Sequence, residues 1–238
     1  MRAVILAGGK GTRLRPYTTL IPKPLVPLGG RYSVLEIVLM QLARAGFDHV
    51  TLAVNHLSEL IKAYFGDGAR FGIRLDYSLE DRPLSTIGPL TLIPDLPESV
   101  LVMNGDILCD LDYRAFFDAH RTAGSQVSVS VYRRDVAVDF GVLRYDAAHA
   151  LTHFEEKPSL AFDVSMGVFC LQRSVVAALE RGRPYGFDDL MRDSLAQGRP
   201  VRVVPFHGYW LDIGRPDDYE YADAHFDELA ARLGIALP

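Results

Sequence analysis

Short apolar runs alternate with helical patterns along the first half of the chain. Runs of strand length occur at 2–6, 49–54, 73–77 and 100–104. Between them, apolar positions recur at helical spacing, which predicts helices over 33–46, 58–66 and about 88–96. Ser33 and Glu36 open the first of these and predict a capping box. Strand–helix alternation of this kind is typical of parallel strands joined by helical crossovers.

The second half of the chain is richer in strand patterns. Polar and apolar side chains alternate over 126–134, and further strands are expected at 140–146, 151–158, 164–171, 201–206 and 209–214. Pro216 favours the start of a terminal helix. We therefore predict an α/β fold with a Rossmann-like, mainly parallel sheet flanked by helices and a mixed or antiparallel extension. With no linker and no hexapeptide repeat, we expect a single domain over 1–238 without a C-terminal β-helix.

Composition excludes several classes of protein. The 238 residues include 23% charged side chains, and no apolar run approaches the ~18 residues of a membrane span. The short run at the N-terminus is typical of a first strand and not of a signal peptide. Cys109 and Cys170 are then expected to be reduced, packed thiols of a cytoplasmic protein that has no membrane partner.

Charge is unevenly distributed along the chain. The net charge of −5 argues against nucleic-acid binding. Arg2, Lys10, Arg13, Arg15 and Lys23 nevertheless all come before the first acidic residue, which is Glu36. An acidic protein with a basic first loop suggests a local site for a compact anion.

That first loop follows strand 2–6 directly and reads LAGGKGTRLRPYTTLIPKP over 6–24. Glycines after a first strand commonly present backbone N–H groups to phosphate. The loop has neither the spacing of a P-loop nor that of a dinucleotide-binding fingerprint, which counts against an NAD- or flavin-dependent oxidoreductase. A phosphate-binding loop of another kind is the remaining interpretation.

The segment 7–24 resembles the signature AGGxGTRLxPxTxxxPKP of the sugar-1-phosphate nucleotidyltransferases, also called nucleotide-sugar pyrophosphorylases. The resemblance implies an enzyme in which Arg13 binds the triphosphate and the leaving pyrophosphate, and Lys23 reaches the α-phosphate; both would be catalytic. It also implies a nucleotide-binding half at about 1–110 and a sugar-phosphate half at about 111–238. The nucleotide-binding residues would be Leu6, Ala7, Gly8, Gly9, Gly11, Thr12, Arg13, Glu80, Pro83, Thr86 and Gly88.

Later segments resemble the same family in the same order. Asp106 in NGD and Asp212 in WLDIG correspond to the family's metal carboxylates, which implies Mg²⁺ as cofactor. Trp210 is expected to pack beneath the site, and Asp110 and Asp112 to be surface or capping residues. The sugar-phosphate residues implied are Asn104, Gly105, Gly141, Glu156, Lys157 and Ser165.

The reaction implied is an in-line attack of a sugar-1-phosphate on the α-phosphate of a nucleoside triphosphate, which releases pyrophosphate. A carboxylate such as Glu80 suits the donor edge of guanine, and the motifs are most like those of mannose-1-phosphate and heptose-1-phosphate guanylyltransferases. We therefore favour GTP with one of those sugars. The alternatives are a uridylyl- or thymidylyltransferase acting on a glucose-like or N-acetylated sugar-1-phosphate, and a non-catalytic nucleotide-sugar-binding regulator. The expected partners are these small molecules, and the protein would be a monomer or homodimer.

Three substitutions depart from the family pattern, and they fall in two of its specificity segments. Ser85 stands where the family has Gly, and Ile87 where it has Ala; Ser165 replaces an Asn. If position 85 requires a positive φ, serine there costs about 1 kcal/mol or more.

Overall fold

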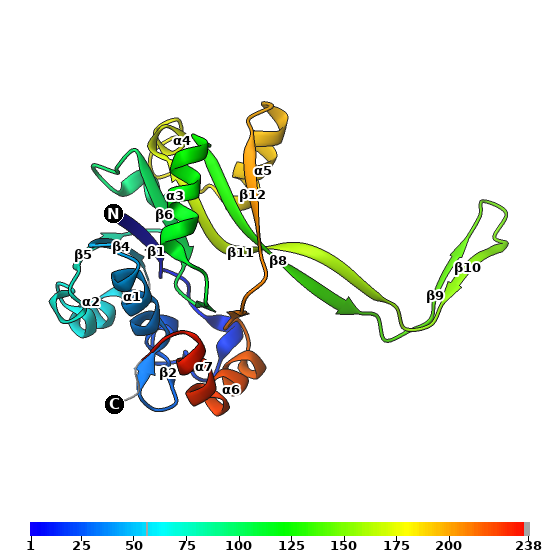
Figure 1. Ribbon diagram of the computed structural model, residues 1–238, viewed down its shortest axis with the longest axis horizontal. Coiled ribbons are helices and arrows are strands. Elements are labelled where there is room, and N and C mark those ends of the chain that lie inside the picture. The colour runs from blue at the N-terminus through cyan, green and yellow to red at the C-terminus, as the bar shows by residue number, and fades with distance from the viewer. Residues whose placement is uncertain (56, 236–238) are drawn as a thin grey trace.

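A computed structural model describes residues 1–55 and 57–235 (Figure 1). Within these residues a seven-stranded sheet has the order β12-β8-β11-β6-β1-β4-β5. Its parallel part consists of β1 (Arg2–Leu6), β4 (His49–Val54), β5 (Arg74–Leu79) and β6 (Ser99–Asn104). Its mixed part consists of β8 (Val127–Ala137), β11 (Ser159–Gln172) and β12 (Val201–Phe206), with β11 antiparallel to both of its neighbours. The predicted mainly parallel sheet with a mixed extension is confirmed.

Helices cover both faces of this sheet (Figure 1). They are α1 (Val34–Arg44), α2 (Ser58–Phe65), α3 (Tyr113–Ala123), α4 (Arg173–Ala177) and α5 (Phe187–Ala196), whereas α6 (Pro216–Ala224) and α7 (Phe226–Arg232) pack in a separate apolar cluster that, among the described residues, includes none from this sheet. Strand β1 shows why two cores form: Ala3 and Ile5 join the cluster that contains α1 and α3 residues, whereas Val4 joins the cluster with α4 and α5 residues. The predicted capping box of α1 is present, with Ser33 N donating to Glu36 Oε2 at 2.7 Å.

The α-helix expected over 88–96 is wrong. The chain instead forms the 3₁₀ helix η4 (Gly88–Leu92), and Ile93 is extended at φ −81° and ψ 118°. Ile93 precedes Pro94, and the proline ring disfavours helical geometry in the residue before it. The apolar spacing therefore continues past the point where the helix ends.

Short elements connect the layers near the sheet's carboxyl edge. They are the 3₁₀ helices η1 (Thr12–Leu14) and η2 (Lys23–Leu25), the pair β2 (Pro27–Leu28) and β3 (Tyr32–Ser33), and the pair β7 (Ile107–Cys109) and β13 (Trp210–Asp212). A third 3₁₀ helix, η3 (Ala69–Phe71), leads into the amino end of β5. Cys109 and Cys170 are buried free thiols, as expected. Among the described residues no helix is long and apolar enough to cross a membrane.

A two-stranded arm leaves the body of the molecule (Figure 1). The outer parts of β8 and β11 form a ribbon that continues into the hairpin of β9 (Val142–Tyr145) and β10 (Leu151–Glu155). We call residues 133–163 the arm. The strands expected at 140–146 and 151–158 do form, but they pair with each other in a separate sheet and do not extend the main one.

Candidate functional site

The glycine-rich loop begins as a continuation of β1. Ala7 N donates to Ala53 O at 2.8 Å, and the chain then turns at Gly11, whose φ is +60°. Thr18 Oγ1 donates to Gly11 O at 2.7 Å, and a Cβ on Gly11 would lie 2.9 Å from Thr18 Cγ2. Gly11 is thus required both by its conformation and by this close approach. The loop is folded tightly against itself, and this fixes the position at which the 3₁₀ helix η1, with Thr12 and Arg13, begins.

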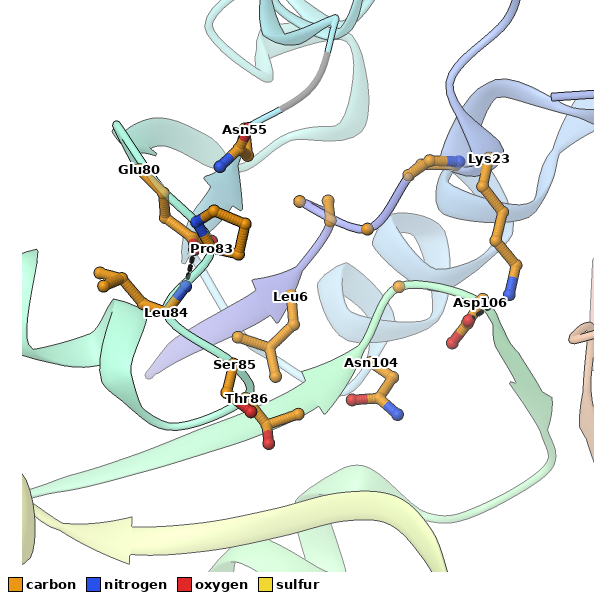
Figure 2. Close-up of a pocket in the computed structure, with 15 residues that line it drawn as sticks. Leu6, Lys23, Asn55, Glu80, Pro83, Leu84, Ser85, Thr86, Asn104 and Asp106 are labelled. Atoms are coloured by element: carbon orange, nitrogen blue, oxygen red, sulfur yellow. Dashed lines mark hydrogen bonds and ion pairs between the residues drawn. The ribbon is translucent and has the colours of Figure 1, made fainter. Parts of the chain in front are cut away.

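A cavity of about 290 Å³ lies at the carboxyl ends of β1, β4, β5 and β6 (Figure 2). It brings together eleven of the expected residues: Leu6, Ala7, Gly8, Gly9, Lys23, Glu80, Pro83, Thr86, Asn104, Gly105 and Asp106. Pro24, Asn55, Leu84 and Ser85 complete its lining. Ligands of open α/β sheets bind at this edge because the connecting loops leave a crevice there.

Glu80 forms one end of this cavity, beside Asn55 (Figure 2). Its side chain is buried, and Leu84 N donates to Glu80 Oε2 at 3.1 Å. Burial raises the pKa of Glu80, and the hydrogen bond from Leu84 opposes that rise. A Cβ on Gly8 would lie 2.9 Å from Glu80 Oε1, so glycine is needed for the loop to approach this carboxylate. The result is a desolvated hydrogen-bond acceptor with one oxygen held by the backbone.

The segment that follows Glu80 has a positive φ at position 85, the case that the sequence raised. Ser85 has φ +66°, so serine occupies a left-handed position where the family has glycine. Thr86 Oγ1 accepts a hydrogen bond from Phe187 N at 2.8 Å. Gly88 is directed elsewhere: its N donates to Tyr185 O at 2.9 Å, and a Cβ there would lie 2.7 Å from Arg183 O. Gly88 thus supports the loop from behind and does not line the cavity.

The opposite end of the cavity holds Lys23 and Asp106, which point toward each other (Figure 2). Lys23 Nζ forms an ion pair with Asp106 Oδ2, whereas Asp106 Oδ1 is buried and has no hydrogen-bond partner among the described residues. Strand β13 brings Asp212 next to this carboxylate, because Asp212 pairs with Ile107 and Ile213 N donates to Asp106 O at 3.0 Å. Burial, and then the negative charge of Asp106, raise the pKa of Asp212.

Two further cavities continue from this end. One shares Thr86 and Asn104 with the first cavity and adds Ser165 and Asp212. The other, of about 440 Å³, contains Arg13 and Asp212 and is also lined by Tyr132, Arg134, Arg215 and Asp218. Asp212 lines both of these cavities, so it connects Arg13 and Ser165 to the Lys23–Asp106 end of the first cavity.

Trp210 packs against its neighbours but also lines both of the further cavities, so it forms part of their wall and does not lie beneath them. Its Nε1 donates to Met166 O at 3.1 Å, and its ring lies 5.4 Å from that of Tyr132. Asp112 caps α3 by accepting from Ala115 N at 2.9 Å, and Asp110 accepts from Tyr209 N and from Arg232 Nε. Asp110 thus ties the start of β13 to α7, Asp112 caps α3, and neither lines the three cavities described above.

Three expected sugar-phosphate residues lie on the arm and not at the cavities. Gly141 packs against the hairpin, where a Cβ would lie 2.8 Å from Phe154 Cε2. Glu156 and Lys157 are exposed at the junction between the β8–β11 ribbon and the β9–β10 hairpin. The structure therefore does not bring these residues to Asp106 within one chain (Figure 1).

Sequence reasoning missed Asn55 and Arg134. Asn55 directly follows β4, so the rule that ligands bind beyond the carboxyl ends of parallel strands could have identified it. Arg134 carried no such signal, because an arginine in an alternating strand is ordinary, and its place at the cavity depends on the path of the ribbon.

Comparison with known proteins gives a consistent result. Residues 2–228 match the family model described as nucleotidyl transferase. The mannose-1-phosphate guanyltransferase of Debaryomyces hansenii is 32% identical over 231 residues, which cover 92% of this chain and 62% of that protein. The UTP–glucose-1-phosphate uridylyltransferase of Synechocystis is 33% identical over 239 residues, covering 92% and 61%. The chain thus spans about three fifths of the length of these curated relatives.

A solved structure shares the fold. The crystal structure of HddC from Yersinia pseudotuberculosis superposes with a TM-score of 0.72 at 25% sequence identity, over 94% of this chain and 99% of that one. The architecture inferred from the strand and helix pattern is therefore that of a solved relative.

Proposed function

Because the chain belongs to the nucleotidyl transferase family, we propose that it is a sugar-1-phosphate nucleotidyltransferase. It would join a sugar-1-phosphate to the α-phosphate of a nucleoside triphosphate and release pyrophosphate. The observation that carries the proposal is the cavity that has a buried carboxylate at one end and a lysine with two aspartates at the other.

The chain's own residues supply positioning and charge. Backbone N–H groups of the glycine loop would face the phosphates, and Arg13 would bind the pyrophosphate end with its fork of donors. Lys23 would exchange its ion pair with Asp106 for the α-phosphate oxygens as negative charge builds on them. The attacking sugar phosphate is already an anion, so no general base is required, and alignment of the reacting atoms carries the rate.

Asp106 and Asp212 fit a Mg²⁺ ion. Mg²⁺ usually binds one or two protein carboxylates and takes its remaining ligands from phosphates and water. Asp106 Oδ1 is buried without a hydrogen-bond partner among the described residues, and burial together with the charge of Asp106 raises the pKa of Asp212, so this pair of carboxylates has acceptor capacity left for a cation beyond Lys23. Once bound, the ion would neutralise charge on the triphosphate.

We propose GTP as the nucleotide. Guanine presents N–H donors at one edge, and Oε1 of buried Glu80, the oxygen that Leu84 N does not bind, is an acceptor at the far end of the cavity from Lys23. The Debaryomyces relative named for guanylyl transfer supports GTP and mannose-1-phosphate, and a heptose-1-phosphate fits the same chemistry. The Synechocystis relative named for uridylyl transfer makes UTP with glucose-1-phosphate the competing pair.

A pyrophosphate-release assay with each of four nucleoside triphosphates and with mannose-, heptose-, glucose- and N-acetylglucosamine-1-phosphate tests the proposal. We expect Mg²⁺-dependent release that is fastest with GTP. Release that is fastest with UTP or dTTP would contradict the role of Glu80. No release with any pair, together with binding of a nucleotide sugar, would favour the regulatory alternative.

A further inference from the structure

The arm carries an apolar surface that nothing in the described chain covers. The register places Val136 opposite Leu160, and Leu143 opposite Phe154, so each pair shares one face of its ladder. The exposed fractions of the arm's large apolar side chains are 45% for Val136, 77% for Phe140, 58% for Leu143, 67% for Tyr145, 61% for Leu151, 56% for Phe154, 44% for Leu160 and 50% for Phe162. Exposed apolar side chains in this number on one projecting element indicate an interaction site, and a lone two-stranded ribbon is only marginally stable in water.

The same arm carries Lys157 away from its own cavity. Strand β11 passes the cavity at Gly167, where a Cβ would lie 2.7 Å from Asn104 Nδ2. From Ser165 to Ser159 the strand then keeps a regular antiparallel register with β8. Six strand steps span about 20 Å, well beyond the reach of a lysine side chain. Lys157 lies between the hairpin and the ribbon, on the ribbon's side of β10, so folding the hairpin over would not shorten this distance.

A surface that suits the arm lies on the first loop of the chain, residues 6–24, which we call the opening loop. Leu20 is 81% exposed and Ile21 43% exposed. Lys10, Arg13 and Arg15 are exposed too, and none of them forms an ion pair with the described residues. Residues 133–163 hold six acidic and four basic side chains, so the arm carries net negative charge opposite a wholly basic loop.

We propose that two copies of this chain exchange arms, so that each arm packs on the partner's opening loop and delivers Glu156 and Lys157 to the partner's cavity. The occupant is a second copy because the arm is apolar and acidic, the opening loop is apolar and basic, and every copy has both parts. A two-fold axis lets both arms bind the partner's opening loop at the same time, and this is the usual geometry of a homodimer. The delivery of Lys157 rests on the proposed function, whereas the exchange of arms does not.

Sedimentation of the purified protein at micromolar concentration tests the exchange without any activity. We expect a dimer for the wild type, a monomer for the double variant Leu143→Ser/Leu151→Ser, and a dimer for the control Leu60→Ser/Leu195→Ser, whose leucines are exposed on the body. A monomeric wild type, or an arm variant that remains dimeric, would overturn the proposal.

A thiol cross-linker shows which copy receives the arm. A Lys157→Cys chain mixed with an Arg15→Cys chain should give a cross-linked peptide pair that joins two chains. A link that forms only within a doubly substituted single chain would mean that the arm folds back on its own body and would overturn the proposal. This measurement remains decisive if the protein has no transferase activity.

Complementation tests the delivery of Lys157. Asp106→Asn and Lys157→Ala proteins should each have low activity, and an equal mixture that is unfolded and refolded together should regain about a quarter of the wild-type rate, because half the dimers are mixed and each has one intact site. A mixture no more active than its components, with an active wild type, would place Lys157 in its own chain's site. A wild type without activity would refute the proposed function and leave the cross-linking result to decide the exchange.

Discussion

Replacing Ser85 by glycine should stabilise the protein. Ser85 has φ +66°, a conformation that costs a residue with a Cβ about 1–2 kcal/mol. Glycine adopts it freely but loses about 0.5–1 kcal/mol more conformational entropy on folding. The difference favours the variant by about 0.5–1 kcal/mol, which in a chain of this length corresponds to a rise in Tm of about 1–4 °C.

The matched control is Ser174→Gly. Ser174 is exposed within helix α4, where serine is unstrained, and glycine there should lower stability by about 0.5 kcal/mol. Thermal and urea unfolding of the two variants and of the wild type measure whether each substitution raises or lowers the free energy of unfolding. If Ser85→Gly unfolds at the same or a lower temperature, the serine side chain is stabilising this loop and the strain argument is refuted.

Three more substitutions test the cavity. Asp106→Asn should lower Mg²⁺-dependent pyrophosphate release by about 10²–10³-fold with an unchanged circular dichroism spectrum; near-normal turnover would contradict its role. Because burial raises the pKa of Glu80, the folded protein loses stability as pH rises from the ordinary glutamate value through the raised one. Glu80→Gln should therefore be more stable than the wild type at neutral pH but equal to it below about pH 4, as urea unfolding at both pH values would show. Trp210→Phe removes the donor to Met166 O and should cost about 1 kcal/mol in the same assay; no loss would mean that the hydrogen bond is not needed.

The body of the fold could be predicted because its signals are local. A buried parallel strand requires an apolar run, as at 49–54, and α1 needs the Ser33–Glu36 capping box, so each pattern has one low-energy outcome. The error at 88–96 has a local cause as well, since Pro94 limits the residue before it and ends the turn whatever the apolar spacing continues to suggest. The family inferred from the motifs is confirmed by the match over 2–228.

The sequence could predict only those cavity residues that lie near the ends of predicted strands. Lys23, Glu80 and Asp106 each lie just beyond or close to a carboxyl end of the sheet, and the structure brings all three to one cavity. Arg134 was missed because its position depends on how far and in which direction a ribbon leaves the sheet, which no short pattern specifies.

The arm shows why motif order does not fix the geometry of a site. Lys157 and Gly167 are ten residues apart, a separation that spans about 15 Å in a helix and about 33 Å in a strand. The alternation of polar and apolar side chains over 126–134 and 164–171 identifies strands, and those strands require the longer span. A lysine at the far end of such a ribbon serves a cavity only if another body comes to meet it. The motifs therefore indicate which residues meet the substrate, whereas strand geometry determines whether one chain can supply them all.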